Sequence, residues 1–181
     1  MQAVPTDLAG VLVLEPKVFG DERGYFMETY NRGEFRRATG FDVDFVQDNH
    51  SHSGRGVLRG LHYQLDPPQG KLVWVTAGAV FDVAVDLRRH SPGFGSWTGV
   101  ELSSENHRQV WIPPGFAHGF YVIADWADVN YKTTEFYSQT GDRSLRWDDP
   151  TIAVKWPLEG APSLSIKDRN APLLDQADLY D

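Results

Sequence analysis

The side chains best suited to chemistry lie in three short segments, residues 59–64, 71–73 and 113–120. They hold His62, which could act as a base, and a second histidine, His118. Two cations, Arg59 and Lys71, lie close to His62 in the sequence. An imidazole base beside two cations is typical of proton transfer on an anionic substrate. Each of these residues also has an ordinary structural explanation.

His62 follows Gly60, where a backbone without a side chain lets a ligand approach closely. Strand alternation would place it on the same face as Leu58, Gly60 and Gln64. Inside a barrel, its neutral imidazole would be available as a base near pH 7. The alternative is a core histidine that hydrogen-bonds to a neighbouring strand.

Lys71 would share a strand face with Val73 and Val75. A lysine on an apolar face is unfavourable unless it meets an anion, so Lys71 indicates a bound ligand or a buried carboxylate. The alternative is a lysine at a strand end whose ammonium group extends back to water.

Tyr131 and Tyr137 lie on or near one predicted strand. A phenol in such a position could donate a proton or stack on a base. Tyrosine is also an ordinary strand residue, and the residues alone favour that explanation.

The second histidine stands where cupin barrels carry one, because a proline–glycine turn leads to His118 on the next strand. Metal-binding cupins supply a His-x-His pair from an earlier strand, but here that strand has His62 and Gln64. The chain also lacks cysteine, so we expect no metal site there. Another His-x-His pair, His50 and His52, lacks a carboxylate at the usual spacing, and a surface or packing role is expected for both.

Short strands dominate the pattern that must position these residues. The clearest alternation is at residues 81–87, and residues 72–76 precede it across residues 77–78, which predicts a hairpin. One helix is predicted, capped by Asn31 and ended by Gly40. Further strands are predicted at residues 11–14, 25–30, 45–49, 99–102, 109–112, 119–123 and 129–134.

Many short strands with regular turn signals predict an all-β sandwich or barrel with a few short helices. The pattern weakens after about residue 140, where proline and aspartate become frequent. We therefore predict a single domain over residues 1–181. Its barrel core would span about residues 10–140, and a C-terminal segment over about residues 141–181 would wrap it.

Composition excludes several classes of function. The net charge of −8 argues against non-specific nucleic-acid binding, although clustered Arg and Lys can still hold a small anion. No apolar run approaches the ~20 residues that cross a membrane, and the N-terminal residues do not resemble a signal peptide, so a cytoplasmic location is expected. The absence of cysteine excludes disulfides and thiolate sites.

Longer motifs follow one another along most of the chain. They are Glu-Arg-Gly-Tyr-Phe at residues 22–26, Phe-Val-Gln-Asp-Asn-His-Ser at 45–51, Gly-Val-Leu-Arg-Gly-Leu-His-Tyr-Gln at 56–64, Gln-Gly-Lys-Leu-Val at 69–73, Val-Phe-Asp-Val-Ala-Val-Asp at 80–86, the proline–glycine turn and its strand at 112–120, Tyr-Lys-Thr-Thr at 131–134 and Lys-Asp at 167–168. By these motifs the chain resembles the dTDP-4-dehydrorhamnose 3,5-epimerases. These are nucleotide-sugar epimerases with a metal-free cupin-type jelly-roll barrel.

The resemblance implies a role for each matching residue. His62 is the expected base, Asp168 the carboxylate that orients it, and Tyr131 the acid on the opposite face of the sugar ring. Lys71 is expected near the 4-keto oxygen. The residues expected to bind the substrate are Arg23, Phe26, Glu28, Gln47, Asn49, Arg59, His118, Tyr137 and Lys167, with Arg59, Lys167 and Arg23 at the diphosphate.

The implied activity is an isomerase that inverts C3 and C5 of dTDP-4-dehydro-6-deoxy-D-glucose without a cofactor, giving dTDP-4-dehydro-L-rhamnose. The residues suit this chemistry, because a 4-keto group acidifies the protons on both adjacent carbons and a cation stabilises the enolate. A homodimer in which N-terminal strands cross to the neighbour is also implied.

Several alternatives stay open at this point. A monoepimerase of a modified dTDP-sugar pathway would invert only C3 or only C5, and a ketoisomerase would move the carbonyl group. A metal-dependent cupin enzyme and a non-catalytic nucleotide-sugar binding module are further candidates. Trp74 and His52 depart from the family pattern and could alter substrate binding.

Overall fold

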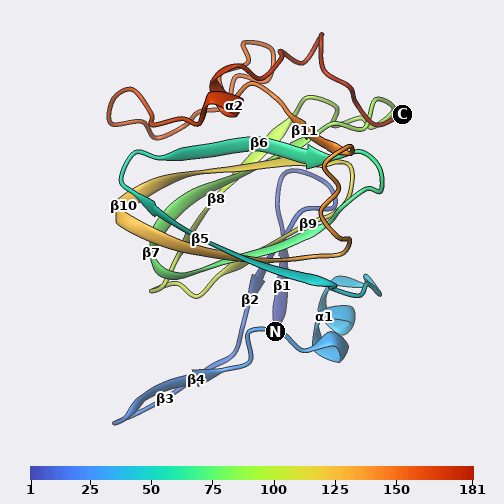
Figure 1. The fold of residues 1–181 in the computed structure, drawn as a ribbon. Coiled ribbons are helices and arrows are strands. Elements are labelled where there is room, and N and C mark those ends of the chain that lie inside the picture. Colours follow the sequence, from blue (N-terminus) through green and yellow to red (C-terminus); the bar gives the residue numbers. More distant parts are fainter.

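The computed structural model describes residues 1–181 as a β-rich fold with two short helices (Figure 1). Nine strands form one rolled sheet, and β3 and β4 form a separate hairpin. The elements are β1 (Gln2–Pro5), β2 (Leu12–Glu15), β3 (Val18–Asp21), β4 (Gly24–Met27), α1 (Arg32–Thr39), β5 (Gln47–Gly54), β6 (Leu58–Gln64), β7 (Lys71–Asp86), β8 (Trp97–Ser103), β9 (Gln109–Ile112), β10 (Phe116–Thr133), β11 (Asp142–Ser144) and α2 (Ile166–Arg169).

Two long strands, β7 and β10, run through both layers of a sandwich and pair with each other along most of their length. The first part of β10 also pairs with β6, and its later part pairs with β5. Similarly, the first part of β7 pairs with β9 and its later part with β8. One layer therefore contains β8, β7, β10, β6 and β11, and the facing layer contains β1, β2, β9, β7, β10 and β5. The predicted all-β jelly roll is confirmed.

The predicted hairpin at residues 77–78 is wrong, because β7 continues through this point. The strands predicted at residues 119–123 and 129–134 are likewise one strand, β10. Register shifts in the β7–β10 pair follow Val122 and Asp128, so the long strands bend between layers without turning back. Gly78 has a φ of 73° and packs against the backbone of Trp126. A glycine of positive φ serves a bulge as well as a turn, so its presence could not decide between them.

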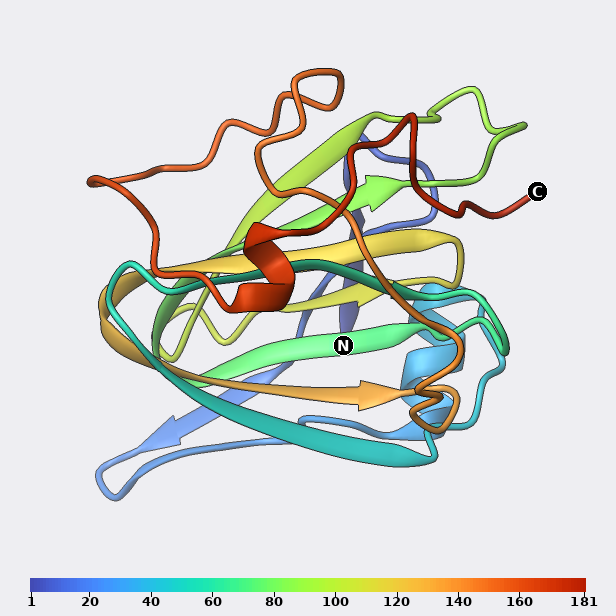
Figure 2. The ribbon, with the colours of Figure 1, turned by 45° about the horizontal axis from the view of Figure 1, so that its top comes forward.

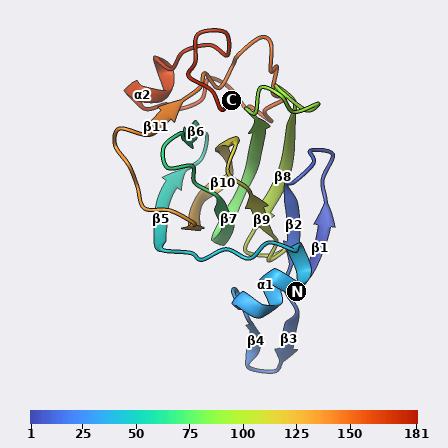
Figure 3. The same cartoon turned by 90° about the vertical axis from the view of Figure 1, so that its right-hand side faces the viewer.

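Buried apolar side chains form three clusters that hold the layers and their coverings together. The largest lies between the layers and includes Val73, Val80 and Phe120. A second lies outside the β6 layer, where the C-terminal segment covers it with residues such as Ile152 and Leu174. Figures 2 and 3 show this segment crossing the outside of the sandwich with α2 resting near β6. The third cluster lies beneath α1.

The helix expected between Asn31 and Gly40 is confirmed as α1. The Asn31 side chain accepts a hydrogen bond from the Glu34 backbone N–H at 3.2 Å, and Gly40 ends the helix with a φ of 78°. Phe35 packs from its inner face onto Trp111 of β9. Neither helix has the length and apolar character needed to cross a membrane.

The β3–β4 hairpin projects away from the sandwich (Figures 1 and 3). Its aromatic residues lie open to solvent, with Tyr25 60% and Phe26 68% exposed. A two-stranded hairpin with an uncovered apolar surface is marginal in water by itself. The arm therefore presents a surface suited to contact with another molecule.

Candidate active site

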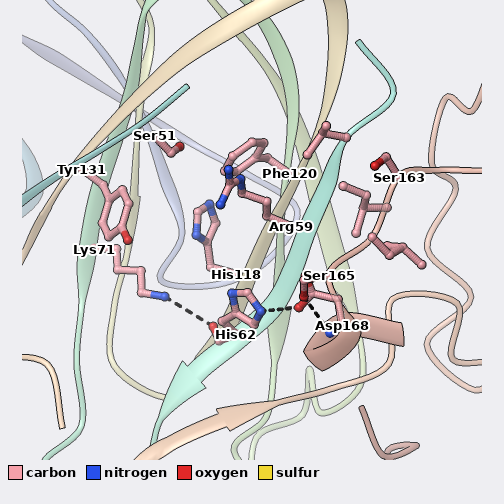
Figure 4. A pocket seen from close by; sticks show the side chains of 13 residues that line it. Ser51, Arg59, His62, Lys71, His118, Phe120, Tyr131, Ser163, Ser165 and Asp168 are labelled. Atoms are coloured by element: carbon pink, nitrogen blue, oxygen red, sulfur yellow. Dashed lines mark hydrogen bonds and ion pairs between the residues drawn. The ribbon is translucent and has the colours of Figure 1, made fainter. Parts of the chain in front are cut away.

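A cavity of about 380 Å³ opens between the two layers (Figure 4). It brings together six of the residues expected in the site, which are Arg59, His62, Lys71, His118, Tyr131 and Asp168. They come from four elements, β6, β7, β10 and α2, so only the folded chain assembles them. The remaining wall residues are Ser51, Val57, Leu58, Phe120, Ser163, Leu164 and Ser165.

Arg59 and His62 reach the same cavity because β6 is irregular between them. Strict alternation would turn residues three apart toward opposite faces. Against β10, however, the register shifts between the pairs His118↔His62 and Phe120↔Arg59. Gly60 allows the shift, since its φ is 130° and a Cβ there would lie 2.5 Å from the Cα of Gly119. The shift adds Arg59 to the face that carries His62.

His62 and Asp168 form a hydrogen-bonded pair in which Nε2 lies 2.5 Å from the carboxylate Oδ1. The Ser165 hydroxyl donates to the other carboxylate oxygen at 2.8 Å and accepts from the Asp168 backbone N–H. Burial opposes ionisation of Asp168, but the hydrogen bonds from His62 and Ser165 outweigh it and lower the pKa below its ordinary value. A charged carboxylate at Nε2 requires a proton there, which leaves Nδ1 with a free electron pair.

Burial shifts the pKa values of both Lys71 and Tyr131. Burial lowers the pKa of Lys71 to about 8, although the nearby carboxylates Asp142 and Asp82 oppose this shift. The Lys71 ammonium donates to the backbone carbonyl of His62 at 3.4 Å. Burial also raises the pKa of Tyr131 above its ordinary value. At neutral pH the cavity therefore holds a cation and a neutral phenol that can donate a proton.

The base and acid candidates stand on opposite walls. His62 belongs to β6 in one layer, whereas Tyr131 lies in the part of β10 that pairs with β5 in the facing layer. Figure 4 shows their side chains extending from different strands into the same space. A ring bound between the layers would meet the imidazole on one face and the phenol on the other.

A second histidine–carboxylate pair lies in the wall. His118 Nε2 is 2.8 Å from Asp82 Oδ2, and both side chains are buried. Asp82 was absent from the predicted site. The sequence feature that could have indicated Asp82 is a carboxylate within the alternating segment at residues 81–87. Both faces of this strand are covered in the structure.

An adjoining cavity of about 500 Å³ shares His62, Lys71 and Tyr131 with the first. Its wall contains four more of the predicted residues, Gln47, Asn49, Tyr137 and Lys167. The two cavities thus meet at the three candidate proton-handling groups.

Asp142 joins two of the residues in the adjoining cavity. Its carboxylate accepts hydrogen bonds from Lys167 at 2.5 Å and Tyr137 at 3.3 Å. Asp142 was not predicted, because it lies on the short strand β11 beyond the segment where the strand pattern was clear.

Gln64 stands where a metal-binding cupin would carry its second histidine. Here its side-chain amide forms hydrogen bonds that hold a neighbouring loop. The side chain is buried, and its NH₂ donates to the carbonyls of Pro67 and Phe136. Its carbonyl oxygen accepts from the Ser138 backbone N–H at 2.8 Å. These bonds hold the loop on which Tyr137 enters the adjoining cavity.

Three predicted residues do not join the others. Arg23 and Phe26 lie on the projecting β3–β4 hairpin, and Arg23 pairs with Asp21 on the same hairpin. Glu28 lies at the base of the arm and accepts a hydrogen bond from Asn31 at 3.2 Å. In the single chain these residues line neither cavity.

The two residues that depart from the family pattern also lie outside the cavities. Trp74 is on β7, opposite Asn130 and Gln109 in the ladder. His52 faces outward from β5, where its Nδ1 lies 2.7 Å from Asp128. His50 contacts the same carboxylate at 3.3 Å.

Comparison with known proteins establishes the family of this chain. A family model described as dTDP-4-dehydrorhamnose 3,5-epimerase matches residues 5–176. The chain belongs to this family. A curated dTDP-4-dehydrorhamnose 3,5-epimerase from Pseudomonas aeruginosa is 54% identical over 180 residues. The match covers 99% of this chain and 99% of that protein. The motif-based recognition of the family, and the class of isomerase that it implies, are confirmed.

Two solved structures are similar to this chain. One is dTDP-6-deoxy-D-glucose-3,5-epimerase from Legionella pneumophila in complex with dTDP-4-keto-L-rhamnose. It superposes with a TM-score of 0.97 at 49% identity, covering 99% of this chain and 97% of that one. The other is a 3'-monoepimerase from Streptomyces bikiniensis in complex with dTDP-quinovose. It superposes with a TM-score of 0.89 at 35% identity, and the match covers 97% of this chain and 88% of that one.

Proposed function

We propose that this protein inverts C3 and C5 of dTDP-4-dehydro-6-deoxy-D-glucose and so forms dTDP-4-dehydro-L-rhamnose. The observation that carries the proposal is the placement of His62 and Tyr131 on opposite walls with Lys71 at the same junction. Inversion needs a proton to leave one face of a carbon and another to arrive at the opposite face. A base and an acid across one cavity meet that need.

Each inversion proceeds in two steps. His62 Nδ1 removes the proton from C3 or C5, and the electrons of the broken C–H bond form a C=C bond while the carbonyl electrons move to the 4-oxygen. The Lys71 ammonium stabilises the resulting enolate. The Tyr131 phenol then donates its proton to the carbon from the other face, and the carbonyl re-forms. Proton exchange with solvent restores the imidazole and the phenol.

Asp168 and Ser165 support the base without touching the substrate. The carboxylate fixes the Nε2–H tautomer and stabilises the imidazolium that forms after proton removal. The Ser165 hydrogen bond holds the carboxylate in place. Asp168 is therefore a positioning residue for His62.

The nucleotide part of the substrate would contact residues of both cavities, because Arg59 lines the first and Lys167 the second. Lys167 and Arg59 provide positive charge for the diphosphate. Gln47 and Asn49, joined by a 2.9 Å hydrogen bond, present amide groups on the same wall. Tyr137 offers an aromatic face for the thymine base.

We also propose a homodimer in which each β3–β4 hairpin completes the partner's site. Arg23, Phe26 and Glu28 are remote from the cavities of their own protomer, and Phe26 is 68% exposed. A crossing arm would cover this apolar surface and bring all three residues to a nucleotide. The single domain over residues 1–181 and the cytoplasmic location stay predictions.

The runner-up is a monoepimerase that inverts C3 alone. Its support is the likeness to the Streptomyces 3'-monoepimerase, at 35% identity. The curated 3,5-epimerases stand at 54% or 55% identity across nearly the whole chain, and this favours double inversion.

Proton NMR of dTDP-4-dehydro-6-deoxy-D-glucose in D₂O with the enzyme tests the proposal. We expect deuterium at both C3 and C5, and none with a His62→Asn control. Deuterium at one carbon would establish the monoepimerase instead. Exchange at neither carbon would refute both.

A further inference from the structure

Strand β5 lines the site with a stripe of polar side chains. Its inward positions are Gln47, Asn49, Ser51 and Ser53, which alternate with the outward residues of the strand. Three of these four side chains form hydrogen bonds within the protein. Gln47 donates to Asn49 at 2.9 Å, and Ser53 accepts from Arg59 at 3.0 Å. Ser51 is the exception, since its hydroxyl oxygen is buried and has no hydrogen-bond partner.

The location of Ser51 distinguishes it from the other buried polar atoms without partners. Those atoms belong to Gln109, Trp111 and Ser144, none of which lines either cavity of the site. Ser51 lines the cavity of about 380 Å³ shown in Figure 4. An unpaired buried hydroxyl is unfavourable unless a bound molecule pairs with it. The hydroxyl is therefore available to a ligand.

The neighbours of Ser51 indicate which part of a ligand it would meet. In the β5–β10 ladder, Asn49 lies opposite Tyr131, and Ser51 is the next inward residue along β5. One further inward step leads to Ser53, which holds the Arg59 guanidinium. Ser51 thus lies between the candidate acid and the candidate diphosphate-binding cation.

In a nucleoside-diphosphate hexose, the 2-hydroxyl lies between the diphosphate, which Arg59 would bind, and the carbon that Tyr131 would protonate. The diphosphate is attached to C1 and the first reacting carbon is C3, so C2 separates them. We propose that Ser51 binds the 2-hydroxyl of the sugar and makes the enzyme selective for 2-hydroxy over 2-deoxy hexoses. This inference rests on the proposed function, because it takes Tyr131 and Arg59 in their proposed roles. A hydroxyl can both donate to and accept from Ser51, which suits it better than the ring oxygen, an acceptor alone.

The test compares two substrates and two enzymes. Rates of deuterium incorporation give kcat/KM for the wild type and Ser51→Ala on dTDP-4-dehydro-6-deoxy-D-glucose and on its 2-deoxy analogue. Loss of one uncharged hydrogen bond should lower kcat/KM of Ser51→Ala on the 2-hydroxy substrate by about 3- to 10-fold. On the 2-deoxy substrate the two enzymes should be equal. Equal losses on both substrates, or no loss on either, would overturn the proposal.

Ser144→Ala is the matched control, because it also deletes a buried hydroxyl without a partner but lies outside the cavities. It should leave the preference between the substrates unchanged. Ser51→Ala should keep or slightly raise the wild-type Tm, since the deleted group makes no hydrogen bond.

Calorimetric Kd values for the two nucleotide sugars separate this inference from the proposed function. If the wild type exchanged no deuterium into either sugar, the proposed reaction would fail. A 2-hydroxyl preference in binding that Ser51→Ala removes would still uphold the role of Ser51. A preference that survives in the variant would overturn it.

Discussion

At the scale of single residues, the site depends on groups whose charge is set by burial. Lys71 is the clearest case, because the cavity places its pKa near the physiological range at about 8. Its ammonium form predominates below that pH and is lost above it. The proposed reaction needs the cation, so Lys71 ties activity to pH.

We predict that kcat/KM falls with rising pH above about 8 for this reason, approaching a tenfold loss per pH unit. Lys71→Arg keeps its charge at all accessible pH values, so its residual activity should lack this alkaline limb. A pH–rate profile of both enzymes makes the comparison. An identical limb in the variant would assign the titration to another group.

The Asp168 carboxylate gives a second residue-scale prediction. Asp168→Asn removes the charge that stabilises the imidazolium and should lower kcat by about 10²- to 10⁴-fold. The affinity for dTDP, measured by calorimetry, should change little because Asp168 supports His62 and not the nucleotide. A variant with full turnover would show that the pair with His62 is dispensable.

At the scale of elements, the irregularity in β6 decides which side chains enter the cavity. Gly60 permits the register shift that places Arg59 beside His62. Other residues at this position would meet both an unfavourable φ and the backbone of β10.

Gly60→Ala should therefore destabilise the protein by about 3 kcal/mol or more, which for a chain of this size lowers Tm by about 10 °C. Gly54→Ala on the neighbouring strand is the control, because a Cβ there meets no atom within 4 Å. Thermal unfolding followed by circular dichroism measures both. Equal Tm values for the two variants would mean that close packing at Gly60 is unimportant.

The element scale also shows what sequence patterns can predict. The cap at Asn31 and the apolar strand β9 were located correctly because their signals are local. The continuity of β7 and β10 was missed, since a bend and a turn use the same glycine chemistry. In the site, the motifs selected His62 and Tyr131, which line one cavity, but Asp82, the partner of His118, could not be found from alternation alone. Alternation gives the face of a residue and not what packs against that face.

At the scale of the whole molecule, the projecting hairpin predicts that one protomer is incomplete. Its exposed aromatic residues and its distance from the cavities both point to a role in a second copy. Mixed dimers can test this directly.

We predict complementation between two inactive variants, His62→Asn and the triple variant Arg23→Ala, Phe26→Ala and Glu28→Ala. In a mixed dimer, the intact hairpin of the first would complete the intact pocket of the second, restoring one site of two. Activity after co-refolding should therefore exceed that of either variant alone. If the hairpin serves its own protomer, no mixture would gain activity, and size-exclusion chromatography would establish whether mixed dimers had formed.

The C-terminal segment has a consequence for the order in which a newly made chain becomes active. All the strands of the sandwich precede Asp168 in the sequence, and 106 positions separate this carboxylate from the histidine it orients. Domains begin to fold while the ribosome is still adding residues. A nascent chain can therefore form the two layers and their core while its base still lacks a partner, so catalytic competence arrives after the architecture is complete.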